Sequence, residues 1–193
     1  MEIERRAFAV DGLCVELRGE AKAPVLRGHA AVFNQLSQDL GGFCEQIAPG
    51  AFAGALKDDV RLLINHDGLP LARTASNTLR LAEDGRGLLI EAELDAEDPD
   101  VLRLLPKMKR GDVNQMSFGF SVKPGGQDWA KDDEGRGVRT LKAVRLFDVS
   151  VVTFPAYAAT DVAVRSLRAW EAASAAPRRQ NLLRALADQA RAL

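Results

Sequence analysis

The longest strand candidate, TLKAVRLFDVSVVTF at residues 140–154, sets the strongest limit on the fold. Its central part, FDVSVVTF, is apolar on both faces, whereas a strand with one solvated face alternates between apolar and polar residues. Such a strand is expected in the middle of a closed or covered sheet, with neighbours on both sides. The sequence therefore predicts a mainly β domain.

Shorter segments supply the neighbours of this strand. We predict strands at 25–34, 60–64 and 114–122, and a β-hairpin over 78–94. Residues 35–46 are expected to form a loop or hairpin connection, and residues 123–138, which are polar and rich in glycine, an exposed hairpin loop. We also expect Asn65 to Gly68 to form a turn, because these residue types favour turns.

Two helices are predicted to flank the strands. The Ala/Leu content after Pro49 favours a short helix over 50–57. Asp98 and Gly111 suit the two ends of a longer helix over 98–112, which Pro106 is expected to kink or end early.

The composition changes after about residue 158. Residues 160–193 are rich in Ala, Arg and Leu, and a helical stripe is expected from Leu182, Leu183, Leu186, Ala190 and Leu193. The sequence predicts a β-rich domain over 1–158 and a helical tail over 159–193.

Charge and cysteine content exclude several classes of protein. The formal net charge is -1, so nothing indicates nucleic acid or an anionic membrane as a partner. No apolar run reaches the roughly 18 residues of a membrane span, and no signal peptide is recognisable. Cys14 and Cys44 lack the spacing of a metal site, which favours a reduced cytoplasmic setting.

The strand 114–122 carries an unusual polar face. Met116, Phe118 and Phe120 alternate with Ser117, Gly119 and Ser121, so one face is apolar and the other holds only very small side chains. Such a bare face indicates either close packing against a neighbouring element or a need for access to Ser117.

Asp148 and His66 are the other side chains with candidate chemistry. Asp148 is expected to share a strand face with Leu146 and Val152, and a buried carboxylate needs a partner. That partner can be an arginine, such as Arg145, Arg139, Arg110 or Arg73, or a histidine. His66 follows the strand 60–64 in a turn, where histidines are usually capped or solvated.

Taken together, these residues predict nucleophilic catalysis. A serine hydroxyl is a poor nucleophile without an adjacent base, an imidazole can take its proton, and a carboxylate can orient the imidazole. Asp95, Glu97, Asp98 and Asp100 form an acidic run, but Asp98 is better explained as a helix cap than as a metal ligand.

Six segments, taken in order, identify a known family. They are GHAAVFN (28–34), EQIAPGAF (45–52), VRLLINHD (60–67), GRGLLIEAEL (85–94), KRGDVNQMSFGFSV (109–122) and RLFDVSVVTFPAYAAT (145–160). The set resembles the prohead maturation proteases of tailed bacteriophages, over roughly residues 25–160.

The resemblance implies a serine peptidase with a small β-barrel related to the herpesvirus assembly protease. The histidine and serine of the family fall on His66 and Ser117. The third member is often a glutamate in the family, and its position here is Asp148, which is one methylene shorter. His29 is the alternative third member. The small residues Gly119 and Ser121 are expected to leave room for a peptide, which could bind by adding a strand to a sheet edge.

The resemblance also implies partners and a location. The family cuts scaffolding protein or the scaffold segment of the major capsid protein inside the assembling prohead, in the host bacterial cytoplasm, and needs no metal or organic cofactor. The tail is expected either to recruit the protease into the assembling shell or to be a site of self-cleavage, with residues 172–176 accessible. A homodimer is expected by analogy. The competing interpretations are a non-catalytic capsid-assembly module with the same fold, and a protease fused to a scaffold.

Overall fold

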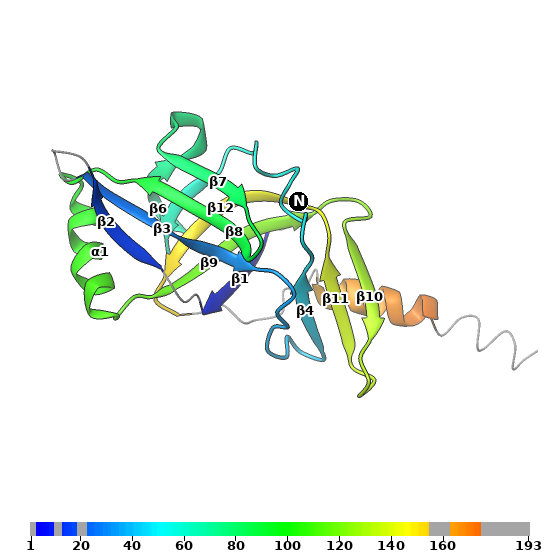
Figure 1. Ribbon diagram of the computed structural model, residues 1–193. Coiled ribbons are helices and arrows are strands. Elements are labelled where there is room, and N and C mark those ends of the chain that lie inside the picture. Colours follow the sequence, from blue (N-terminus) through cyan, green and yellow to red (C-terminus); the bar gives the residue numbers. More distant parts are fainter. Residues whose placement is uncertain (1–2, 10–12, 19–22, 155–162, 175–193) are drawn as a thin grey trace, which may run out of the picture.

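The computed structural model describes residues 3–9, 13–18, 23–154 and 163–174. Its elements are mostly strands, arranged in three sheets (Figure 1). The first sheet has the order β1-β9-β12-β5-β6, the second β2-β3-β8-β7 and the third β10-β11-β4. The strands are β1 (Glu4–Ala9), β2 (Cys14–Arg18), β3 (Ala23–Val32), β4 (Phe43–Ile47), β5 (Arg61–Ile64), β6 (Asp67–Arg73), β7 (Leu79–Glu83), β8 (Gly87–Glu93), β9 (Gln115–Val122), β10 (Gln127–Lys131), β11 (Gly137–Leu141) and β12 (Val144–Val152).

The mainly β prediction is confirmed, but the barrel is not. None of the three sheets closes into a ring among the described strands. The five-stranded and four-stranded sheets instead pack around one apolar core, to which α1 (Pro99–Arg110) adds Val101 and Leu104. Burying each large apolar side chain there contributes about 1.5–3 kcal/mol.

The central position predicted for the apolar strand is also confirmed. β12 lies between β9, with which it pairs antiparallel, and β5, with which it pairs parallel. The predicted length was wrong, because the segment 140–154 divides between two sheets. The backbone amides of Lys142 and Ala143 both donate to the carbonyl of Gly126, which turns the chain between β11 and β12.

Most of the other predicted elements are present. The strands at 25–34, 60–64 and 114–122 and the hairpin over 78–94 correspond to β3, β5, β9 and the pair β7–β8. Asp98 caps α1 by accepting from the amide of Asp100, and Gly111 ends the helix with φ 82°. The helix passes through Pro106 without ending there.

Three local predictions were wrong. Residues 50–57 form successive turns instead of a helix, with bonds from the amide of Ala53 to the carbonyl of Gly50 and from that of Ala55 to Phe52. The expected loop or hairpin connection 35–46 contains most of β4. The expected hairpin loop 123–138 is too long, because it contains β10 and the start of β11. These short strands are stabilised by pairing with one another, which composition alone does not reveal.

Residues 163–174 form a helix that packs on the three-stranded sheet (Figure 1). Ala163 and Leu167 join Leu40 and Phe43 in a second small core, and the ring of Trp170 stacks on Trp129. The helical prediction is confirmed for this part of the tail, and residues 172–174 of the expected cleavage stretch are helical. The rest of that stretch and the stripe over 182–193 lie outside the described residues. No helix in the described ranges is long and apolar enough to cross a membrane.

Candidate active site

Ser117 lies in the middle of the five-stranded sheet. In β9 it is flanked by Ala7 of β1 on one side and by Ser150 of β12 on the other. Its side chain is on the opposite face from Met116 and Phe118, which are in the core, and Ser117 itself is fully buried. The alternation predicted from sequence is therefore confirmed, and the small-residue face carries the serine.

Asp148 reaches the same face through an irregularity in β12. The register with β9 shifts between Leu146 and Asp148, so that Leu146 lies opposite Phe120 and Asp148 opposite Gly119. Leu146 belongs to the core, and the expected shared face of Leu146 and Asp148 was wrong. A β-bulge commonly redirects a side chain in this way.

Gly119 provides the space for this carboxylate. A Cβ added to Gly119 would lie 2.2 Å from Asp148 Oδ2 and 3.1 Å from its Cγ, and β9 is held there by neighbours on both sides. The absence of a side chain at Gly119 therefore accommodates Asp148. The expectation that Gly119 leaves room for a peptide is replaced by this closer explanation.

His66 is held by a tight turn between β5 and β6. Asn65 and His66 both have positive φ, 54° and 61°, as in the two-residue hairpin turns that suit a right-twisted sheet. Such a conformation costs energy for a non-glycine residue and is found preferentially at functional sites. Asn65 stabilises the turn through two hydrogen bonds. Its side-chain Oδ1 accepts from the backbone amide of Thr153 at 2.8 Å, and its backbone amide donates to the carbonyl of Val151.

The three residues form one chain of hydrogen bonds. His66 Nε2 lies 2.7 Å from Ser117 Oγ, and His66 Nδ1 lies 2.5 Å from Asp148 Oδ1. A neutral imidazole with its proton on Nδ1 donates to the carboxylate and accepts from the serine hydroxyl. Groups arranged in this way can transfer the serine proton to His66 while Asp148 stabilises the imidazolium that forms.

Ser150 is a fourth polar residue in this cluster. Its hydroxyl donates to Asp148 Oδ1 at 2.7 Å, lies 3.2 Å from His66 Nδ1, and is fully buried. Sequence reasoning missed it, although its position two residues after Asp148 placed both on one strand face.

The hydroxyl of Ser117 has a second acceptor. It lies 2.8 Å from the backbone carbonyl of Arg6 in β1, in addition to its contact with His66. A hydroxyl carries one proton, so Ser117 can donate either to Arg6 or to His66. Sequence reasoning missed Arg6 because a backbone contact between residues 111 positions apart leaves no motif.

The arginines expected as partners of Asp148 have other contacts. Arg139 pairs with Glu4 and Glu45, and Arg73 with Asp59. Arg110 pairs with Asp112, and the guanidinium of Arg145 stacks over the ring of Phe147. The histidine alternative is thus the one present in the structure.

His29 belongs to β3 and lies away from this cluster, where it contacts the turn between β7 and β8. Its Nε2 is 2.8 Å from Asp84 Oδ2. Burial raises the pKa of Asp84, but hydrogen bonds from His29 and from the amides of Arg86 and Gly87 outweigh it and lower the pKa to about 2. The alternative assignment of His29 as the third catalytic member has no geometric support.

This pair predicts a specific pH dependence of stability. Because the pKa of Asp84 is lower in the folded chain than its ordinary 3.8, its contribution is present above pH 3.8 and is lost as the pH falls towards about 2. We expect Asp84→Asn to lose less stability than the wild type over that window, measured by urea unfolding at pH 5, 3.5 and 2.5. Equal losses in both proteins would contradict the assignment.

Within the described ranges, no group of three or more His, Cys, Asp or Glu side chains is placed to hold a metal ion. Within the acidic run, Asp98 caps α1 and Asp95 accepts from the backbone amide of Glu97, so two of its carboxylates serve local backbone structure.

The hydroxyl, imidazole and carboxylate of this site are arranged as in the serine hydrolases, which occur on unrelated folds. The family model for caudovirus prohead serine proteases matches residues 13–174, and the chain belongs to that family.

The proteins similar to the chain include two phage proteases. It is 33% identical over 161 residues to the prohead protease of Enterobacteria phage HK97, covering 78% of this chain. The match spans 64% of the length of that relative. The capsid assembly protease of bacteriophage T4 has a similar fold, with a TM-score of 0.51 and 12% identity over 80% of this chain and 98% of that one.

Proposed function

We propose that the chain is a serine endopeptidase of phage prohead maturation, with Ser117 as nucleophile, His66 as general base and Asp148 as its orienting carboxylate. The hydrogen-bonded chain from Ser117 through His66 to Asp148 is the observation that carries the proposal. Membership of the prohead serine protease family supports the same reaction class.

The proposed reaction follows from the proton positions. His66 Nε2 takes the proton of Ser117 Oγ as the oxygen attacks a peptide carbonyl. The imidazolium then protonates the leaving amine, and water repeats the sequence to release the acyl group from Ser117. The contact between Ser117 and the carbonyl of Arg6 must open first, because it competes for the same proton.

The substrates that we propose are the scaffolding protein or the scaffold segment of the major capsid protein, cut inside the prohead in the host cytoplasm. The names of both relatives, a prohead protease and a capsid assembly protease, support this setting. Self-cleavage, a homodimer, the division at residue 158 and a relation to the herpesvirus assembly protease stay predictions.

A non-catalytic assembly module is the alternative function. Burying polar side chains costs free energy unless they are hydrogen-bonded. A module without catalysis gains nothing from a buried serine, imidazole and carboxylate held within hydrogen-bonding distance of one another. The intact chain of contacts therefore favours the enzyme.

Ser150 is proposed as a positioning residue. Its hydroxyl donates to the same oxygen of Asp148 that faces His66. We expect Ser150→Ala to lower kcat about 10-fold to 100-fold with little change in KM, because a hydrogen bond to a charged group is worth about 1.5–3 kcal/mol. Ser150→Thr keeps the hydroxyl and is expected to recover part of the rate. An unchanged kcat in Ser150→Ala would exclude this role.

Covalent labelling tests the proposed chemistry. A fluorophosphonate is expected to form one adduct on the wild-type protein, at Ser117, located by peptide mass spectrometry. His66→Ala is expected to abolish the adduct, whereas Ser121→Ala, two alternate positions along the same strand face, keeps it. An adduct on a different serine, or labelling that is unaffected by His66→Ala, would contradict the proposal.

A further inference from the structure

Strand β1 lies along the edge of β9 at the position of Ser117. The antiparallel register pairs Ala7 with Ser117 and Arg5 with Gly119. The other edge of β9 is bonded to β12, which carries Asp148 and Ser150. β1 therefore takes the edge of β9 that the rest of the sheet leaves free.

β1 contacts the side chain of Ser117 through its own backbone. Ser117 Oγ lies 2.8 Å from the carbonyl oxygen of Arg6, which can accept its proton, and Ser117 is buried. Any extended peptide in the same register can place a carbonyl there, whatever its side chains, because strand addition depends on main-chain bonds. A strand in this position thus brings a peptide carbonyl to the proposed nucleophile.

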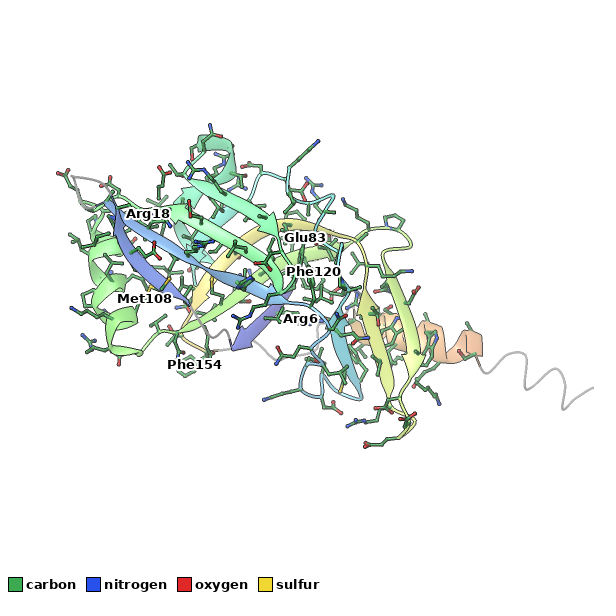
Figure 2. All side chains as sticks on the ribbon, in the orientation of Figure 1. Arg6, Arg18, Glu83, Met108, Phe120 and Phe154 are labelled. Atoms are coloured by element: carbon green, nitrogen blue, oxygen red, sulfur yellow. The ribbon has the colours of Figure 1, made fainter. Side chains whose placement is uncertain are left out.

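A buried cluster of four charges holds β1 in place. Glu4 and Arg6 of β1 contact Glu45 of β4 and Arg139 of β11, with Arg6 Nε 2.8 Å from Glu45 and Arg139 Nη1 2.7 Å from Glu4. All four are at most 2% exposed. Figure 2 shows Arg6 close to Phe120 of β9, over whose ring its guanidinium lies. Two positive and two negative groups compensate one another only in this arrangement, so the cluster fixes the register of β1.

The family match begins at residue 13, after β1. The matched part contains β9, β12 and the β5–β6 turn, and therefore all three residues of the proposed triad. Within the matched and described residues, β12 pairs with one edge of β9, and no strand pairs with the opposite edge. β1, which precedes the matched residues, occupies that edge.

We propose that the edge of β9 from Gln115 to Phe120 is the binding site for the substrate strand, and that β1 is its internal occupant. An extended peptide of the substrate pairs antiparallel with β9 in place of β1 and presents its scissile carbonyl to Ser117. The peptidase is latent while β1 is docked. This inference rests on the proposed peptidase function and adds the site and direction of its substrate.

A reversible tether between β1 and β9 tests the inference in the full chain. Ala9 and Gln115 are register partners, and directly opposed residues of antiparallel strands are close enough for a disulfide. The variant Ala9→Cys/Gln115→Cys is made in a Cys14→Ser/Cys44→Ala background, so that only the new pair can close. The readout is the rate of fluorophosphonate labelling at Ser117, before and after reduction.

We expect the oxidised tether to lower the labelling rate about tenfold or more, and reduction to restore it, because β1 can then open locally. Each single cysteine variant serves as a control and is expected to respond to neither treatment. Glu45→Gln, which removes one charge of the cluster at nearly constant shape, is expected to label faster than wild type.

The possible failures are distinguishable. If the double-cysteine variant is labelled at Ser117 at the same rate when oxidised and when reduced, the inference is overturned and the peptidase proposal stands. If neither the reduced double-cysteine variant nor the wild type is labelled at Ser117, the proposed function is overturned, and the inference with it.

Discussion

Replacing Asp148 by alanine is expected to lower kcat about 10⁴-fold, the scale on which removal of the triad carboxylate acts in serine peptidases. The reason is local: Asp148 Oδ1 is the acceptor for His66 Nδ1, so its loss frees the imidazole to rotate and leaves the imidazolium unpaired. Initial rates of cleavage of the capsid protein by purified variants measure the effect.

Asp148→Asn separates the two contributions of this carboxylate. The amide oxygen can still accept from His66 and Ser150, but the negative charge that stabilises the imidazolium is gone. Its rate is therefore expected between those of wild type and Asp148→Ala. A rate for Asp148→Ala within a few-fold of wild type would remove Asp148 from the proposed mechanism.

The second large effect is expected at Gly119. A methyl group there would lie 2.2 Å from Asp148 Oδ2, so the carboxylate must swing away from His66 in Gly119→Ala. We expect kcat to fall about 10³-fold or more, towards that of Asp148→Ala. Gly85→Ala is the matched control, because a Cβ at Gly85 meets nothing within 4 Å.

A double variant makes this prediction specific. If Gly119→Ala acts only by displacing Asp148, then adding it to Asp148→Ala should cost little further activity, since interacting residues are not additive. Losses that multiply in the double variant would instead mean that Gly119 acts through another route. Urea unfolding of each variant separates a loss of fold from a loss of rate.

The fold could be predicted where the pattern was local. The alternation around Ser117, the apolar character of β12 and the cap at Asp98 were all readable, because periodicity and capping depend on neighbouring residues. The short strands β4 and β10 were not, because they exist through pairing with β11, and a sequence does not show its long-range partners.

The candidate site was partly readable for the same reason. His66, Ser117 and Asp148 were selected as residue types with matching chemistry, and the structure brings them within hydrogen-bonding distance. The role of Gly119 was misread, because a bulge in β12 decides which side chain fills the space above it. The Arg6 carbonyl belongs to a backbone, which carries no residue signature.

Co-expression with the major capsid protein of the same phage tests the central claim most directly. The masses of the capsid protein and of this chain are compared for wild type, Ser117→Ala and Ser121→Ala. We expect a shortened capsid or scaffold product with wild type and Ser121→Ala, and only full-length protein with Ser117→Ala. The same shortened product with Ser117→Ala would contradict the assignment of Ser117 as the nucleophile.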